Sequence, residues 1–387
     1  MHNSDLSLRI RAWYDVHRRD LPWRGTTDAY RIWLSEIILQ QTRVAQGLDY
    51  YRRFLDAYPT VAALAAATED EVLALWQGLG YYSRARHLHA AARQVMEHYG
   101  GTFPTRSDQL LRLSGVGAYT AAAVASFAAG EDVAVVDDNV YRVLARLFDV
   151  TEPIDTGRGV RLFQQLADEL LPHGDSARHN QAMMELGALC CTPASPDCAH
   201  CPVADACLAR AAGTVDQRPL KAGRTRVLPR RLVYFLFKYN NVLWGRRRPA
   251  GDIWQGLYEY VSVDVSQAAL DEAAPRAGAS PQVQATPLPS PQPDASAATG
   301  GDTAPDALLR ALLPEDELAL VRTVRPLALG RRQRLTHRLL TVDCWMVEVA
   351  GEVHPAGGFL PFTWEEWSEK AVPKLISEIN VQVSDLF

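Results

Sequence analysis

The spacing of apolar residues divides the chain into two parts of different character. From about residue 8 to residue 211 the apolar positions recur three and four apart, for example at Leu162, Phe163, Leu166, Leu170 and Leu171. This period is that of one face of a helix. The first part of the chain is therefore predicted to be all-α.

After Arg230 the apolar residues form short continuous runs instead. Residues 232–237 read LVYFLF, a polar KYNN turn follows at 238–241, and apolar residues resume at 242–244. Residues 341–349 form a second run of the same kind. Such runs bounded by polar turns are typical of strands. The second part is therefore predicted to be an α+β domain.

Two further segments differ in composition from the domains around them. Residues 214–231 contain two prolines and many arginine and lysine residues, which suits a linker near phosphate groups. Residues 273–305 consist largely of Ala, Pro, Gln, Ser and Gly, which predicts a disordered insertion. We therefore expect a helical domain at 1–213, a linker at 214–231 and a second domain at 232–387.

The overall composition is that of a globular protein, with 48% hydrophobic and 22% charged residues. No apolar run approaches the roughly 18 residues of a membrane helix, and the polar N-terminus lacks a signal-peptide pattern, so we expect a soluble, cytoplasmic protein. The formal net charge of -5 excludes a uniformly basic nucleic-acid binder. Any contact with nucleic acid must use local basic patches and backbone amides.

Four of the six cysteines lie close together near the end of the helical part. Their spacing is C-x6-C-x2-C-x5-C, formed by Cys191, Cys198, Cys201 and Cys207. Four thiolates in one loop suit either a [4Fe-4S] cluster or tetrahedral zinc, and the residue types do not choose between them. Cys190 and Cys344 lie outside the pattern and are predicted to be unligated core residues.

A glycine-rich turn leads into an apolar helical segment at 122–129. The turn reads LSGVGAYTA over residues 113–121 and includes Gly115, Val116 and Gly117. Glycines at a helix entrance let the backbone approach a phosphate, with free N–H groups pointing at it. The same residues would also suit a plain turn between two helices.

Two acidic residues lie in contrasting surroundings. Glu36 is in the apolar helical run IWLSEIILQQT, which should desolvate its side chain and raise its pKa. Asp137 directly precedes a helical run, whose dipole should favour the ionised carboxylate. Without further context, Asp137 could be only a helix cap and Glu36 only a solvated helix residue.

Three longer motifs place these residues in a family. The motifs WLSExxLQQT (33–42), GLGYYxRARxLH (78–89) and VxDxNV (135–140), with the glycine turn and the cysteine spacing, resemble MutY-type adenine DNA glycosylases of the endonuclease III superfamily. The resemblance covers residues 8–210. It implies a helix-hairpin-helix DNA glycosylase domain with a [4Fe-4S] cluster. It also implies excision of adenine opposite 8-oxoguanine or guanine in double-stranded DNA, by a monomer in base excision repair.

The resemblance also assigns roles at the reacting sugar. It implies that Glu36 protonates the base, while Asp137, oriented by Asn139, stabilises or covalently captures the sugar; two carboxyl groups in different protonation states suit this reaction. Tyr119 stands where endonuclease III has the lysine that forms a Schiff base. A phenol cannot form an imine, so the expected activity is monofunctional. Asp138 departs from the family pattern, which has glycine there.

Base flipping requires residues that fill the gap and others that hold the base. By resemblance, the intercalating residues are Gln40, Gln41 and Tyr81. The residues of the adenine pocket are, on the same basis, Trp23, Arg24, Leu39 and Gln181.

The second domain also resembles its counterpart in this family. Residues 245–259 resemble a stretch of the Nudix-like C-terminal domain, but no R-E-x-x-E-E metal-binding cluster follows, which favours recognition over pyrophosphate hydrolysis. Leu335, Thr336 and His337 occupy the place of a Phe-Ser-His loop that reads 8-oxoguanine. A plain turn at a strand entry is the alternative for these three residues.

Three other functions were weighed. A thymine-mismatch glycosylase and an endonuclease III-like lyase are both disfavoured by Glu36, and Tyr119 argues most strongly against the lyase. A DNA-binding protein without catalytic activity is disfavoured because both carboxylates and Asn139 are present.

Overall fold

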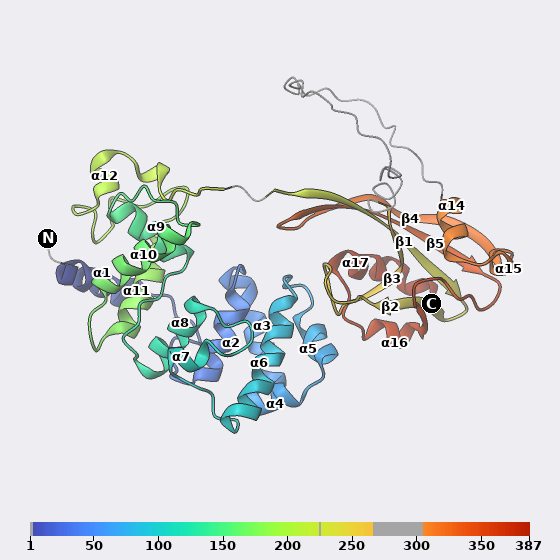
Figure 1. Cartoon of the computed structure of the whole chain (residues 1–387), viewed down its shortest axis with the longest axis horizontal. Helices are drawn as coiled ribbons and strands as arrows, with labels where there is room; N and C mark the ends of the chain where they lie inside the picture. The colour runs from blue at the N-terminus through green and yellow to red at the C-terminus, as the bar shows by residue number, and fades with distance from the viewer. Residues whose placement is uncertain (1–2, 224–225, 266–304) are drawn as a thin grey trace, which may run out of the picture. The chain divides into compact units, whose positions relative to one another are not determined.

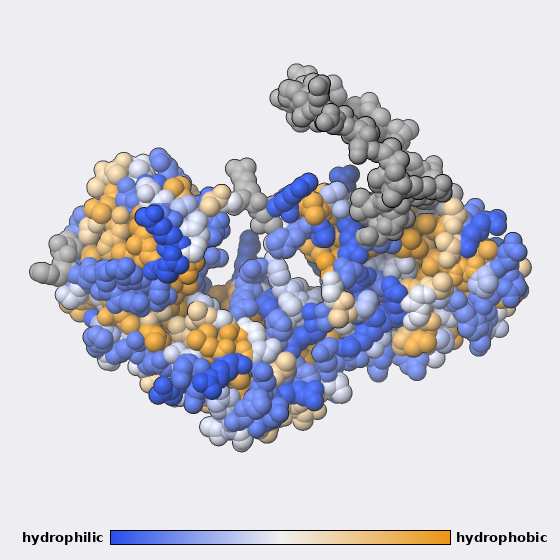
Figure 2. Space-filling model, in the orientation of Figure 1, coloured by the Kyte–Doolittle hydropathy of each residue, from blue (hydrophilic) through white to orange (hydrophobic). Residues whose placement is uncertain are grey.

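The computed structural model describes residues 3–223, 226–265 and 305–387. The chain forms two compact units, Met1–Arg224 and Thr225–Phe387, each described by itself below (Figure 1). On the face that Figure 2 shows, hydrophilic residues cover most of both units. None of the described helices is long and apolar enough to cross a membrane.

The first unit is built from helices, which confirms the prediction from apolar spacing. Its elements are α1 (Asn3–His17), α2 (Ala29–Leu39), α3 (Val44–Ala57), α4 (Val61–Ala66), α5 (Glu69–Trp76), α6 (Ser83–Tyr99), α7 (Ser107–Leu110), α8 (Ala118–Ala129), α9 (Asp138–Leu147), α10 (Gly157–Leu170), α11 (Ser176–Leu189), α12 (Leu208–Ala212) and the 3-10 helix η1 (Val215–Gln217).

Helix α2 lies in the interior of this unit because it is apolar on nearly every side. Nine of its eleven residues are buried, and it packs against α3, α6 and α8. It begins at Asp28, whose side chain accepts hydrogen bonds from the Tyr30 and Arg31 backbone N–H groups. Glu36 is thereby carried on a rigid, largely dry helix.

A second group of helices, α1, α9, α10 and α11, surrounds a core of its own. Leu144, Phe163 and Leu186 are among its fully or almost fully buried side chains. The cysteine loop that follows α11 packs against the same core. The VxDxNV motif at the start of α9 and the cysteine loop are therefore parts of one packed body.

The second unit contains a six-stranded mixed sheet with helices, so the predicted α+β character of this part is confirmed. The strands are β1 (Leu228–Tyr239), β2 (Val242–Arg247), β3 (Tyr258–Asp264), β4 (Val321–Arg334), β5 (Arg338–Val349) and β6 (Leu360–Thr363). The described helices are α14 (Pro305–Leu312), α15 (Glu315–Leu318), α16 (Trp364–Ser368), α17 (Lys374–Val383) and η2 (Ser384–Leu386).

The sheet order is β4-β5-β1-β3-β2-β6, with β1 and β5 parallel and the other pairs antiparallel. Strand β1 is central and buried on both faces, which explains its unbroken apolar run. Leu232, Tyr234 and Leu236 face a core shared with α17. Val233 and Phe235 face a second core shared with α14.

Some observed boundaries differ from the sequence expectations. Residues 214–231, expected to be a linker, include η1 and the first four residues of β1. The expected insertion at 273–305 lies outside the described residues except for Pro305, which begins α14. Strand β4 was not predicted from the sequence, because it is an edge strand whose arginines and glycine hide the strand pattern.

Candidate active site

One cleft of the helical unit gathers most of the predicted site residues. Its walls come from the segment before α2, from α2 itself, from the entrances of α8 and α9, and from α11. The predicted residues that line it are Trp23, Arg24, Glu36, Leu39, Gln40, Gln41, Gly115, Gly117, Tyr119, Asp137, Asp138, Asn139 and Gln181. Two of the predicted DNA-binding residues lie apart from this lining: Tyr81 is exposed in the turn before α6, and Val116 is buried in the glycine turn.

Glu36 is buried in this cleft, with 6% of its surface exposed. Burial raises its pKa to about 7, and the negative charge of Asp137 acts in the same direction. The hydroxyl of Tyr119 donates a hydrogen bond to Glu36 Oε2 at 2.5 Å, which opposes the rise. A carboxyl with this pKa is present in both protonated and ionised forms near neutral pH, as a proton donor requires.

Asp137 is the N-cap of α9 and faces the cleft as well. Its carboxylate accepts hydrogen bonds from the Val140 backbone N–H and from Asn139 Nδ2, each at 2.7 Å. Burial nevertheless raises the pKa of Asp137, and the two hydrogen bonds only oppose this. The helix end favours the ionised carboxylate as expected, but desolvation outweighs this effect, so the net shift of the pKa is upward. Asp137 is therefore both the N-cap of α9 and a lining residue of the cleft.

Tyr119 is the second residue of α8 and lines the same cleft as Glu36 and Asp137. Burial and the charges of Glu36 and Asp137 raise its pKa well above the usual value. The phenol therefore stays protonated and acts as a hydrogen-bond donor to Glu36.

Three charged residues that line the cleft were not predicted from the sequence, and of these Glu185 on α11 is the acidic one; the others are Arg19 and Arg43. Glu185 is fully buried, and its carboxylate accepts hydrogen bonds from Arg19 and Arg24 at 2.6 to 2.9 Å. Burial alone would raise its pKa, but the hydrogen bonds from Arg24 and Arg19 lower it to about 2. Glu185 therefore remains ionised and anchors Arg24 in the cleft. In sequence it resembles any glutamate on a helix, since both arginines are distant along the chain.

The amide of Gln181 is oriented from behind by Tyr14. The Tyr14 hydroxyl donates to Gln181 Oε1 at 2.6 Å. This contact assigns the oxygen of the amide to the protein and leaves Nε2, a donor, for a ligand in the cleft.

In the glycine turn, the backbone at Gly115 lies too close to α6 for a residue with a side chain. Gly115 has φ +70°, and a Cβ there would come within 2.5 Å of the His87 side chain. The Ser114 backbone N–H donates to Gln94 Oε1 at 2.7 Å, which fixes the turn to α6. Gly117 is the N-cap of the 12-residue helix α8, so free N–H groups meet the cleft here.

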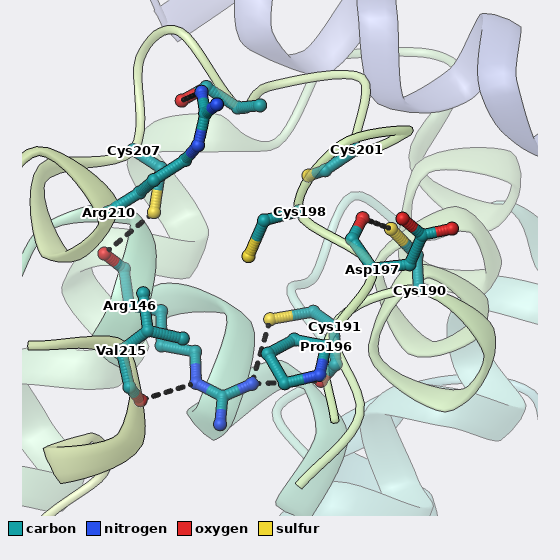
Figure 3. Close-up of a pocket in the computed structure, with 11 residues that line it drawn as sticks. Arg146, Cys190, Cys191, Pro196, Asp197, Cys198, Cys201, Cys207, Arg210 and Val215 are labelled. Atoms are coloured by element: carbon teal, nitrogen blue, oxygen red, sulfur yellow. Dashed lines mark hydrogen bonds between the residues drawn. The ribbon is translucent and has the colours of Figure 1, made fainter. Parts of the chain in front are cut away.

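The four predicted cysteine ligands face a common space (Figure 3). The sulfurs of Cys191, Cys198, Cys201 and Cys207 point toward it, while Cys190 Sγ is turned aside and donates to the Asp197 carbonyl at 3.3 Å. Arg146 Nη1 donates to Cys191 Sγ at 3.3 Å, as suits a thiolate. In the described parts of the chain, no group of three or more Cys, His, Asp or Glu side chains is placed closely enough to hold a single metal ion.

Arg142 joins the cysteine loop to the cleft. Its Nε donates to the Cys191 carbonyl at 2.7 Å, and its Nη2 donates to Asn139 Oδ1 at 2.9 Å. Asn139 in turn donates to Asp137. A continuous chain of hydrogen bonds therefore runs from the cysteine loop to the carboxylate.

In the second unit, residues 335–337 form the tight turn between β4 and β5. Leu335 N–H donates to the Arg338 carbonyl at 2.8 Å, and the Leu335 side chain packs against the sheet core. Thr336 and His337 are exposed. Leu335 is therefore a packing residue of this turn, whereas the other two are accessible to a ligand.

Comparison with known proteins gives a family match over the part of the chain that contains the main residues of the cleft. The family model described as "HhH-GPD superfamily base excision DNA repair protein" matches residues 34–168, which include Glu36, the glycine turn and Asp137. A solved structure titled as a thermostable thymine-DNA glycosylase has 30% sequence identity and a TM-score of 0.51, over 54% of this chain and 97% of that one. Fold and site thus define a helix-hairpin-helix protein of base excision repair.

Curated relatives narrow this class. The adenine DNA glycosylase of Buchnera aphidicola subsp. Schizaphis graminum is 30% identical over 259 residues, which are 67% of this chain and 75% of that protein. The adenine DNA glycosylase of Mus musculus is 46% identical over 211 residues, 51% of this chain. The chain belongs to the adenine DNA glycosylase family. It spans only 38–40% of the length of the mammalian relatives.

Proposed function

We propose that the chain is a monofunctional adenine DNA glycosylase, which hydrolyses the N-glycosidic bond of adenine paired with 8-oxoguanine or guanine. The observation that carries this proposal is the buried Glu36, with its pKa raised to about 7, in one cleft with Asp137 and the protonated Tyr119. Family membership supports the choice of adenine as the base.

The two acids divide the chemistry. Adenine is a poor leaving group, so Glu36 in its acid form donates a proton to a ring nitrogen of the base. Positive charge then develops on the sugar, and the Asp137 carboxylate stabilises or captures it. The hydrogen bonds from Val140 and Asn139 leave the ionised form of Asp137 in a fixed position for this role.

The cleft also fits a flipped purine. Trp23 and Leu39 provide apolar surface, and Gln181 Nε2 provides a donor that suits an acceptor nitrogen of adenine. Arg24, held by Glu185, supplies a fixed positive charge beside Glu36.

Strand cleavage is not part of the proposed reaction. A lyase of this superfamily uses a lysine amine that forms an imine with the sugar. Here the corresponding place holds Tyr119, a phenol whose pKa is raised well above its usual value. Water therefore adds to the sugar carbon from which adenine has left, and the product is an abasic site in an intact strand.

Cys191, Cys198, Cys201 and Cys207 fit a [4Fe-4S] cluster, because four sulfurs from one loop face a common space and an arginine donates to one of them. When bound, the cluster supplies a rigid cross-link of the loop that packs on α9. Chemical analysis of the purified protein should give iron and sulfide. Zinc without iron would contradict this assignment.

The second unit is proposed to be the Nudix-like domain that reads 8-oxoguanine. Thr336 and His337 are exposed at the turn, and a threonine hydroxyl donates and accepts as a serine hydroxyl does. Three exposed arginines of β4 precede the turn, at 331, 332 and 334, where they can contact the DNA backbone.

The test is base release from matched duplexes by the full chain and by Glu36→Gln. The substrates carry adenine opposite 8-oxoguanine, adenine opposite guanine, or thymine opposite guanine, and strands are analysed with and without alkali. We expect release of adenine only, with strand breaks only after alkali, and loss of about 10²-fold or more in the variant. Release of thymine, or breaks without alkali, would contradict the proposal.

A further inference from the structure

One arginine of helix α6, Arg84, contacts both of the turns that carry the expected intercalating residues Gln41 and Tyr81. Arg84 lies in the first turn of α6 and is 8% exposed. Its Nη1 donates to three backbone carbonyls at the end of α2, at 2.9, 2.9 and 2.5 Å: those of Ile37, Ile38 and Gln40. Carbonyls at a helix C-terminus lack partners within the helix, and a cation there suits the helix dipole.

The same guanidinium reaches the second turn. Arg84 Nη2 donates to the Gly80 carbonyl and to Thr42 Oγ1, each at 3.3 Å. The guanidinium carbon lies 5.6 Å from the ring centroid of Tyr81 and 5.0 Å from that of Trp76. One side chain therefore holds residues 40–42 and residues 80–81 together.

Both turns carry a residue in a backbone conformation that needs support. Gln41 has φ 54° and Tyr81 has φ 48°, values that non-glycine residues adopt only where their surroundings impose them. Both side chains are exposed. The backbone that carries each exposed side chain is thus fixed before a ligand arrives, which reduces the entropy lost on binding.

Only an arginine can make this set of contacts. Five hydrogen bonds to four backbone carbonyls and one hydroxyl use the planar fork of the guanidinium, which a lysine lacks. Burial lowers the pKa of Arg84 to about 10, so the group remains charged near neutral pH.

We propose that Arg84 is a positioning residue for base flipping, which fixes Gln41 and Tyr81 at the spacing required to enter the duplex. The inference rests on the proposed function and on the family resemblance, which implies that Gln41 and Tyr81 intercalate where the adenine is flipped out. Arg84 itself touches neither the base nor the sugar in this account.

The first test needs no DNA. Amide hydrogen exchange is measured on the full chain and on Arg84→Lys, Arg84→Met and Arg93→Met, the last being an exposed arginine of the same helix. Exchange at residues 39–42 and 78–82 should be faster in both Arg84 variants and unchanged at α8 and in Arg93→Met. Unchanged exchange in the two turns, or equally faster exchange throughout the unit, would overturn the proposal.

The second test separates flipping from chemistry. Single-turnover adenine release is compared between an adenine in a stacked pair with guanine and an adenine in a bulge, which is easier to extrude. Arg84→Lys should lose about ten-fold or more on the paired substrate and no more than about three-fold on the bulge. An equal loss on both would overturn the positioning role. If the unaltered chain released adenine from neither substrate, the proposed function would fail, and the exchange measurement would still decide the role of Arg84.

Discussion

The two carboxyl groups to which the proposal assigns chemistry, Glu36 and Asp137, differ in their hydrogen-bond partners. Glu36 receives one hydrogen bond, from a phenol, whereas Asp137 receives two, from a backbone N–H and an amide. Burial raises the pKa of both. The additional donors at Asp137 favour its ionised form relative to Glu36, which supports the division into an acid and a carboxylate.

The substitution Asp137→Asn distinguishes the role of this side chain as a helix cap from the role of its negative charge. Asparagine caps helices about as well as aspartate, so the thermal midpoint of unfolding should change little. Single-turnover adenine release should fall by about 10²-fold or more because the charge opposite the sugar is lost. Asp138→Asn, which removes the exposed neighbouring charge, is the matched control. A similar loss in both variants would argue for a general effect of charge at this helix end.

Tyr119→Phe should change the pH dependence of the reaction. The Tyr119 hydroxyl lowers the pKa of Glu36, so its removal should raise that pKa further. The acid form would then persist to higher pH, and the decline of the single-turnover rate should move to higher pH. Tyr99→Phe serves as the control, because Tyr99 is the last residue of α6 and does not line this cleft. A decline that stays in place or moves to lower pH would refute the assigned contact.

Sequence alone predicts single residues where their local surroundings decide their chemistry. The raised pKa of Glu36 followed from the apolar run around it. The raised pKa of Asp137 did not follow from the sequence, since the burial of this side chain comes from elements distant in the chain. Glu185 was missed for the same reason: its partners Arg19 and Arg24 lie about 160 residues away.

At the scale of elements, the site depends on how closely α11 packs on α9. A Cβ at Gly187 of α11 would lie 2.6 Å from Asn139 Cβ and 2.9 Å from the Asn139 carbonyl oxygen. Asn139 is the residue that donates to Asp137. The close approach of these two helices therefore holds the carboxylate in place.

Gly187→Ala should force the two helices apart. We expect a loss of about 1–3 kcal/mol in the free energy of unfolding, as for overpacking, together with slower adenine release. Gly157→Ala is the control, because the nearest atom to its new Cβ is the Arg161 Nη1 at 3.8 Å. Equal unfolding free energies for the two variants would contradict the packing described here.

Elements with strong periodicity were predictable, and those formed by tertiary contacts were not. The helices of the first unit and strands β1 and β5 follow from their apolar patterns. Strand β4 contains exposed arginines and a bulge region around Gly330, so only its pairing with β5 makes it a strand. The start of β1 at Leu228 was also not predicted, because a proline and two arginines separate Leu228 from the apolar run that begins at residue 232.

At the scale of the whole molecule, each unit has its own core, so the roles proposed for the two units, base removal and lesion recognition, can be tested separately. Thr336 and His337 are exposed in the second unit, whereas the catalytic cleft is formed by the first. His337→Ala should leave release of adenine opposite guanine unchanged. It should reduce the preference for adenine opposite 8-oxoguanine by roughly ten-fold, the effect of one hydrogen bond to a ligand.

His354→Ala, a change at another exposed histidine of the second unit, is the control for this prediction. The chain ended at Arg224 extends the test, because it retains the whole first unit. The truncated chain should release adenine opposite guanine and adenine opposite 8-oxoguanine at similar rates. A truncated chain that retained the full preference would assign lesion recognition to the first unit.

The pH dependence of single-turnover adenine release by the unaltered chain tests the central claim most directly. If Glu36 donates the proton, the rate follows its protonated fraction, which is high below its pKa of about 7 and falls above it. The account therefore predicts a rate that declines as pH rises through about 7, and a Glu36→Gln variant without this decline. A rate that increases through the same range would show that the ionised form is active, and would contradict the assignment of Glu36 as the acid.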